Sequence, residues 1–263
     1  MPYGSQPPSY WGSVIPEHWT DDTCFTWCLK DQELQGKTFS QCGQDLIVEE
    51  FCNSSNTRLF LDLGANNGVD LSSSLLLEKM GWAGLLVEPN LELIHTLTNN
   101  RKSDVLSAAV SPNNGITILS TSHMHTLGTL SSSSSYQVDR LVRETRGGIK
   151  AIRTQLTPTV TFSSLIKTFV KYYGYKPDFL KIDIEGMEEY VLACLCEGKI
   201  FPDIIEVENN LRTSVWSQMM HNSGYKCCIV MDSFVEIWVR SNISVTSNTA
   251  LVAKVIENAR VLK

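Results

Sequence analysis

The chain is poor in several features that would place it in a specialised class of protein. Its 263 residues contain no apolar run of the roughly 18 residues that a membrane-spanning helix requires. Lys and Arg number only 22 against 28 Asp and Glu, and this net charge of −6 argues against a protein that coats nucleic acid. The first twenty residues have neither the basic start nor the apolar block of a secretory signal. We therefore expect a cytoplasmic protein, with a secretory lumen as the alternative if the sequence is a fragment of an anchored protein.

Histidine-paired cysteines and phosphate-binding loops are also missing. The eight cysteines include no two pairs at zinc-finger spacing with histidine partners, and a chain of this length does not need disulfides as staples. No complete P-loop, G-x-x-x-x-G-K-[ST], is present. The apolar fraction of 43% is that of an ordinary globular protein with a substantial core.

The hydrophobic pattern predicts an N-terminal arm, residues 1–39, followed by one domain, residues 40–263. Strands are expected at 58–63, 84–89, 104–111, 158–162, 178–186 and 202–209, and a closing hairpin at 225–231 and 234–240. Helices are expected at 43–53, 70–80, 91–101, 187–198 and 212–222, with others after residue 162 and near the C-terminus. This alternation predicts an α/β fold, a Rossmann-like doubly wound sheet that is mostly parallel with a C-terminal antiparallel hairpin. Residues 112–157 contain a Ser run and a Gly pair and are predicted to be a long mobile loop.

The stretch LFLDLGANNGVD, residues 59–70, places a carboxylate at the end of a buried strand and follows it with a Gly-rich loop. Ligands of open α/β sheets bind at the carboxyl ends of the strands, so this loop is expected to line the binding crevice. Glu88 ends the next strand, twenty residues after Gly68, where an acid accepts hydrogen bonds from ribose hydroxyls. Asp62 and Glu88 together indicate a ligand that contains a nucleoside.

The spacing of the two glycines separates the candidate cofactors. NAD requires G-x-G-x-x-G, whereas Gly64 and Gly68 follow G-x-x-x-G, and Asp62 beside a pyrophosphate would repel it. A cationic ligand would instead be stabilised by that carboxylate. S-adenosylmethionine carries an ammonium, a sulfonium and a ribose but no phosphate. The pair Asp62 and Glu88 therefore favours S-adenosylmethionine over NAD.

A second charged stretch, LKIDIEG, places Lys181, Asp183 and Glu185 on one side of a predicted strand. Methyl transfer to an alcohol needs alignment and removal of one proton. Asp183 is predicted to accept the proton or to orient the hydroxyl, with Glu185 and Lys181 tuning it. A divalent ion on Asp183, Glu185 and Glu208 is a further possibility, and an internal ion-pair network is the competing structural interpretation. His123 and His125, in the long loop, are alternative bases or solvent-exposed side chains.

These segments resemble the FkbM-type S-adenosylmethionine-dependent methyltransferases. The similarity spans about residues 40–240. It includes SQCGQD (40–45), FLDLGANNGVDLSSS (60–74), LEKMGWAGLLVEPN (77–90), NNR (99–101), AAVS (108–111), FLKIDIEGMEEYVL (179–192) and IIEVEN (204–209). The family usually has Ser-Asn where this chain has Ser72-Ser73.

The resemblance implies roles for individual residues. The methionine moiety would be held by Asp62, Gly64, Asn66 and Gly68, and the ribose by Glu88. Ala109 would lie against the adenine, and Gln44 and Asp45 would close over the cofactor.

The resemblance also implies the reaction. The implied activity is O-methylation of a hydroxyl on a sugar, a glycan or a small natural product. The alternative is a catalytically inactive binding or trafficking protein with the same fold.

Overall fold

The structure is a computed structural model, and it describes residues 34, 36–52, 57–122, 128–130, 135–145, 152–210, 214–231, 235–243, 250–258 and 260–261. Most of the expected arm, 1–39, therefore lies outside the described residues, and its boundary stays a prediction. None of the described helices is long and apolar enough to cross a membrane.

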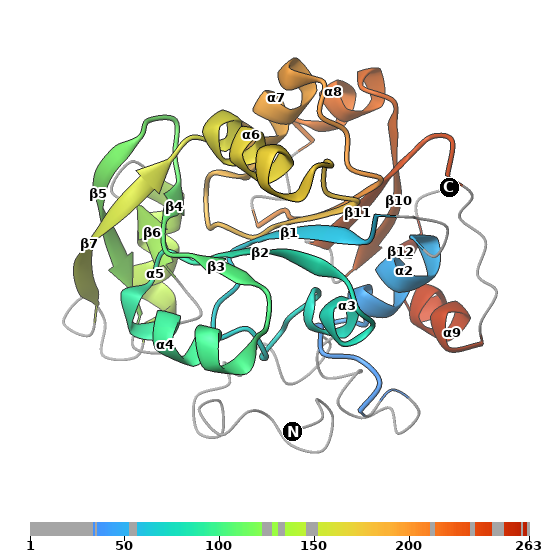
Figure 1. Cartoon of the computed structure of the whole chain (residues 1–263), viewed down its shortest axis with the longest axis horizontal. Helices are drawn as coiled ribbons and strands as arrows, with labels where there is room; N and C mark the ends of the chain where they lie inside the picture. The colour runs from blue at the N-terminus through green and yellow to red at the C-terminus, as the bar shows by residue number, and fades with distance from the viewer. Residues whose placement is uncertain are drawn as a thin grey trace.

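The main sheet has eight strands in the order β12-β10-β11-β9-β8-β1-β2-β3 (Figure 1). The strands are β1 Leu59–Leu63, β2 Ala83–Val87, β3 Asp104–Leu106, β8 Phe179–Ile182, β9 Ile204–Glu208, β10 Tyr225–Met231, β11 Val235–Arg240 and β12 Arg260–Val261. The run from β3 to β9 is parallel, whereas β11, β10 and β12 are antiparallel to their neighbours. The predicted doubly wound sheet with a C-terminal hairpin is confirmed.

Helices cover both faces of this sheet (Figure 1). On one face, α2 Gln44–Phe51, α3 Leu75–Lys79 and α9 Ala250–Asn258 pack over Phe60, Phe179 and Ile204. On the other face, α6 Phe162–Tyr173, α7 Glu188–Gly198 and α8 Ser217–Asn222 pack over Leu61, Leu180 and Ile205. Alternate residues of one strand point to opposite faces, so β1, β8 and β9 each supply both cores. Helix α4, Leu91–Asn100, packs on the first face through Leu97; it follows β2 and begins at the side-chain cap of Asn90.

A second sheet occupies much of the segment that was predicted to be a loop. Its order is β4-β7-β5-β6, and it lies at the left of Figure 1. The strands are β4 Ala109–Val110, β5 Gly115–Thr121, β6 Gly128–Leu130 and β7 Arg153–Val160, and α5 Ser135–Glu144 packs against β6. We call these five elements the inserted lobe. The prediction of a mobile loop over 112–157 is wrong for the described residues of this segment, because β5 and β7 pair along their length.

The inserted lobe also breaks the strand predicted at 104–111. That segment forms β3 in the main sheet, turns at Leu106–Ala108, and continues as β4 in the second sheet. Ala109 therefore begins β4 and does not end the third strand of the main sheet, which corrects the sequence interpretation. The boundary was missed because DVLSAAV reads as one uninterrupted apolar segment.

Two further elements are shorter than predicted. The helix expected at 70–80 is only α3, Leu75–Lys79, because the serines before it are buried and hydrogen-bonded to side chains of other elements. The strand expected at 178–186 ends at Ile182, after which the Asp183 amide still donates to the Leu63 carbonyl at 3.0 Å. The short β12 was not predicted.

Candidate active site

The sequence-predicted carboxylates meet at the carboxyl ends of the parallel strands. The strand order reverses between β1 and β8, and this reversal point is where ligands of such sheets bind. Asp62 lies near the end of β1, Glu88 follows β2, Asp183 follows β8, and Glu208 ends β9.

The two loop glycines leave room for other parts of the protein. Gly64 has φ +90°, and a Cβ built there would lie 1.8 Å from the carbonyl oxygen of Asp183. Gly68 has φ +80°, and a Cβ there would lie 2.6 Å from side-chain atoms of both Leu97 and Arg101. The sequence suggested that a ligand approaches these glycines closely, but the atoms that approach them in the structure belong to the chain itself. Gly64 joins the loop after β1 to the end of β8.

Arg101 holds the loop after β1 in place. Its side chain is fully buried and donates to the Gly68 carbonyl at 3.1 Å, to the hydroxyls of Ser72 and Ser74 at 3.3 and 3.2 Å, and to Glu78 at 3.1 Å. A buried guanidinium with this many acceptors ties the loop to α3 and to the end of α4.

Asp62 is buried and only half satisfied. Its Oδ2 accepts a hydrogen bond from Ser74 at 2.6 Å. Its Oδ1 has no hydrogen-bond partner among the described residues, and the nearest cation is the ammonium of Lys181 at 3.8 Å. An unpaired oxygen of a buried carboxylate is costly, so this atom suits a donor from a ligand.

Asp62, Lys181 and Glu206 form a row across three adjacent strands. The register pairs Asp62 with Lys181, and Lys181 with Glu206, on the face that carries Phe60 and Phe179. Burial raises the pKa of Glu206 to about 8, against the opposing effect of Lys181 and a hydrogen bond from Ser73. Burial disfavours the charged form of Lys181, but Asp183, Asp62 and Glu206 outweigh it and raise its pKa. Lys181 is therefore a permanent positive charge in an acidic site.

Glu88 is the second buried acid of the cofactor side. Its two oxygens accept hydrogen bonds from the backbone amides of Asn66 and Asn90, each at 2.8 Å. Burial raises the pKa of Glu88 to about 7, and the two amides partly oppose this shift. Asn66 has φ +52°, so the Glu88 contact holds the loop in a left-handed turn.

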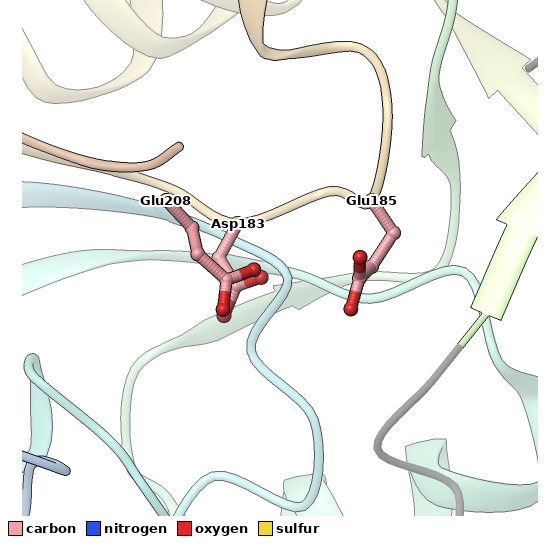
Figure 2. A group of neighbouring side chains, drawn as sticks. All are labelled: Asp183, Glu185 and Glu208. Atoms are coloured by element: carbon pink, nitrogen blue, oxygen red, sulfur yellow. The ribbon is translucent and has the colours of Figure 1, made fainter. Parts of the chain in front are cut away.

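Three carboxylates gather beyond β8 and β9, and Figure 2 shows how they face one another. Oxygens of Asp183, Glu185 and Glu208 all lie within 4.8 Å. Lys181 donates to Asp183 at 3.1 Å, and Asn210 donates to Glu208 at 2.6 Å and to Glu185 at 3.2 Å.

Asp183 and Glu208 share a hydrogen bond, and their pKa values shift in opposite directions. Burial opposes ionisation of Asp183, but Lys181 and Glu208 hold the pKa of Asp183 below its usual value. Burial, Asp183 and Glu185 raise the pKa of Glu208 well above its usual value. Within the pair, Asp183 is the stronger acid, and Glu208 keeps a proton to higher pH.

The remaining predicted residues have other contacts or lie outside the described residues. Ala109 is buried in the inserted lobe in one cluster with Met187, which precedes α7. Gln44 opens α2 and accepts a hydrogen bond from the Cys42 amide at 2.6 Å. The carboxylate of Asp45 is occupied by local donors, among them Ser40 at 2.7 Å. Contacts of Ala109 and Gln44 with a cofactor stay predictions. His123 and His125 lie outside the described residues.

Sequence reasoning missed the partners that organise the site. No role was predicted from the sequence for Arg101, Glu206, Asn210 and Arg140, or for the serines that precede α3. Arg101 stands in the segment NNR, but nothing local marks it as buried. Ser73 and Ser74 were predicted to lie in a helix. In the structure they donate hydrogen bonds to Glu206 and Asp62, which lie 133 and 12 residues away in the chain.

Comparison with known proteins assigns the chain to a family. Residues 62–227 match the Methyltransferase FkbM domain. The chain belongs to the FkbM methyltransferase family. Membership implies a methyltransferase that uses S-adenosylmethionine, as expected from the resemblance. No curated protein sequence matches the chain.

Among solved structures, that of precorrin-6y C5,15-methyltransferase from Geobacter metallireducens GS-15 is similar. The identity is 10%, the alignment covers 80% of this chain and 87% of that one, and the TM-score is 0.40. The fold of this FkbM family member therefore rests on its own sheet order and register.

Proposed function

We propose that the chain transfers the methyl group of S-adenosylmethionine to a hydroxyl of a sugar, a glycan or a small natural product. The observation that carries the proposal is the buried Oδ1 of Asp62, which lacks a hydrogen-bond partner among the described residues and lies beside the glycine loop. The methionine ammonium of the cofactor is positively charged and can donate a hydrogen bond to this oxygen.

The cofactor would extend from Asp62 to Glu88. Loop residues Gly64, Asn66 and Gly68 connect these two acids, and the second lone pairs of the Glu88 oxygens are suited to ribose hydroxyls. Ala109 would lie against the adenine, and Gln44 would close the site from α2. The net negative charge of this edge favours a sulfonium cofactor over a phosphate-bearing one.

Asp183 would receive the proton of the acceptor hydroxyl. When bound, S-adenosylmethionine supplies an electrophilic methyl group, so the S–CH₃ bond breaks as the O–CH₃ bond forms. The hydroxyl proton would pass to a charged carboxylate, and Asp183 suits this role better than Glu208, because its pKa is lowered whereas that of Glu208 is raised. Lys181 keeps Asp183 charged, and Glu185 flanks the position of the acceptor.

A divalent ion on Asp183, Glu185 and Glu208 is the alternative to direct proton acceptance by Asp183. The three oxygens are close enough for one ion, and hard cations prefer carboxylate ligands. Such an ion would have to displace the proton of Glu208 and share Glu185 with Arg140. Calorimetric titration of the wild-type protein with Mn²⁺ tests this alternative separately.

Calorimetric titration with S-adenosylhomocysteine tests the cofactor assignment. We expect micromolar binding by the wild type and a loss of about tenfold or more in Asp62→Asn, since one charge-assisted hydrogen bond is removed. Glu92→Gln, an acid-to-amide change at an exposed position of α4, is the matched control and should bind like the wild type.

The outcomes separate the functional classes. Binding that depends on Asp62 supports the methyltransferase and justifies an acceptor screen with a labelled methyl donor. A folded wild-type protein that does not bind S-adenosylhomocysteine would overturn the proposal and favour the non-catalytic binding protein.

A further inference from the structure

One side chain of the inserted lobe reaches the carboxylates beyond β8. Arg140, in the middle of α5, donates to Glu185 Oε2 at 2.5 Å. The two side chains are only 12% and 13% exposed, so water screens the pair weakly. Gln137 and Leu141, buried on the same helix, keep α5 seated in the lobe.

Glu185 lies in a turn that Glu188 holds on both sides. Its φ of +53° lies in the left-handed region, which a non-glycine residue seldom adopts. Glu188 accepts hydrogen bonds from the two backbone amides that flank Glu185, which fixes the backbone and leaves the direction of the Glu185 carboxylate to its own contacts. The same oxygen, Oε2, accepts from Arg140 and from Asn210. Arg140 therefore supplies a charged contact that orients this carboxylate.

The carboxylates have a cation at each end. Lys181 contacts Asp183 at one end, and Arg140 contacts Glu185 at the other. Between them, Asn210 bridges Glu185 and Glu208, and Glu208 bonds Asp183. Burial raises the pKa of Glu208, and Arg140 acts against that rise although it lies on α5 of the inserted lobe and Glu208 lies in the main sheet.

We propose that Arg140 is a positioning residue that holds Glu185 at the acceptor side of the site and serves there as a built-in cation. This role of Arg140 rests on the proposed methyltransferase function. The contact itself can be tested by Mn²⁺ binding, which does not require methyl transfer. A divalent ion would need the same carboxylate, so Arg140 and an ion compete for Glu185. The inserted lobe thereby contributes a functional side chain to the main sheet.

Mn²⁺ is the probe for this competition, measured by calorimetry and by the loss of its free-ion electron paramagnetic resonance signal. We expect weak binding by the wild type and binding at least tenfold tighter by Arg140→Met, which removes the charge but keeps an unbranched side chain. Arg140→Lys should stay close to the wild type. Arg143→Met, the same substitution at an exposed position of α5, is the matched control and should not change Mn²⁺ affinity.

The double variant Arg140→Met/Glu185→Gln locates the effect. We expect it to lose the Mn²⁺ affinity that Arg140→Met gains. Equal Mn²⁺ affinity in the wild type and Arg140→Met would overturn the proposal, as would a gain that survives Glu185→Gln. If Arg140→Met does not fold, tight Mn²⁺ binding by Arg140→Lys or by the wild type would also overturn it.

S-adenosylhomocysteine affinity, measured in the same variants, distinguishes the two proposals. Arg140→Met should bind it within about twofold of the wild type, because Arg140 contacts neither Asp62 nor Glu88 in any described hydrogen bond. Failure of the wild type to bind S-adenosylhomocysteine would remove the proposed function but leave the Mn²⁺ result on Arg140 intact.

Discussion

Individual acids of this site differ in charge because their partners differ. Asp183 contacts Lys181 and stays ionised, whereas Glu206 and Glu88 are buried with mainly neutral donors and have raised pKa values. A cluster of this kind can keep some carboxyl groups protonated and use others as acceptors at one pH. The distinction cannot be read from residue type, since both kinds of acid follow apolar strands in the sequence.

Glu88 predicts a pH dependence of stability. Its pKa is about 7 in the folded chain against 4.5 for an ordinary Glu, so the folded state binds the extra proton. The stabilisation is complete below pH 4.5 and is lost as the pH rises through 7, and it amounts to roughly 3 kcal/mol. Between pH 4.5 and 9, we expect the free energy of unfolding of the wild type to fall by roughly 3 kcal/mol relative to that of Glu88→Gln. Urea unfolding at each pH measures this difference.

Other buried acids titrate in the same direction, so only the comparison with the variant isolates Glu88. Glu92→Gln should follow the wild type at every pH, because Glu92 is exposed on α4. Parallel pH profiles for wild type and Glu88→Gln would contradict the assignment of the raised pKa to this residue.

Arg101 predicts a large loss of stability on substitution. Arg101→Met removes the donor to the Gly68 carbonyl and to two serines and leaves Glu78 without its cation. Breaking a buried charge network of this kind costs about 3–5 kcal/mol. The free energy of unfolding in urea measures it. Lys102→Met, at the adjacent exposed position, should change stability by less than about 0.5 kcal/mol, and an equal loss in both variants would argue against the assigned role.

At the scale of elements, the site depends on the junction between β1 and β8. The loop after β1 passes so close to Asp183 that no side chain fits at Gly64. This contact places the glycine loop, which is proposed to hold the cofactor, directly beside the proposed proton acceptor. Backbone packing therefore couples the two parts of the proposed site.

Gly64→Ala should be far more damaging than the same change at Gly81. Both glycines have nearly the same positive φ, +90° and +89°, so the conformational cost of about 1–2 kcal/mol is shared. At Gly81 a Cβ meets nothing within 4 Å, whereas at Gly64 it would lie 1.8 Å from a carbonyl oxygen. We expect Gly81→Ala to fold with a modest loss in urea unfolding and Gly64→Ala to lose several kcal/mol or fail to fold. Similar losses would show that φ, and not the clash, decides the residue at Gly64.

At the scale of the whole molecule, the functional groups lie at one edge of the main sheet. Asp62, Glu88, Asp183 and Glu208 come from four parallel strands, and parallel strands bring all their carboxyl ends to the same edge. The opposite edge carries structural contacts, such as Asp178 with the amide of Leu59 at 2.8 Å. The molecule thus separates ligand chemistry from structural capping by strand polarity alone.

Hydrogen exchange should reveal this polarity. At S-adenosylhomocysteine concentrations about 100 times its Kd, binding stabilises the folded state by about 2.7 kcal/mol. We expect local protection beyond this global effect in residues 62–74, 88–90 and 183–186, measured by mass spectrometry of proteolytic fragments. Residues 57–59 and 176–178, at the opposite edge, should show none beyond the global effect. Added protection that is equal at both edges would contradict the location of the site.

The sequence by itself determined the sheet, the hairpin, and the family. Local alternation of apolar strands and helices is enough to predict a doubly wound sheet, and the order of its parallel strands makes Asp62, Glu88 and Asp183 converge whatever the loops do. Tertiary structure alone decided what surrounds them. Arg101, Glu206 and Arg140 act through contacts with residues 23 to 133 positions away in the chain, and β4 to β7 are stabilised by pairing with one another. Burial and long-range pairing set these contacts, and neither leaves a periodic signal in the local sequence.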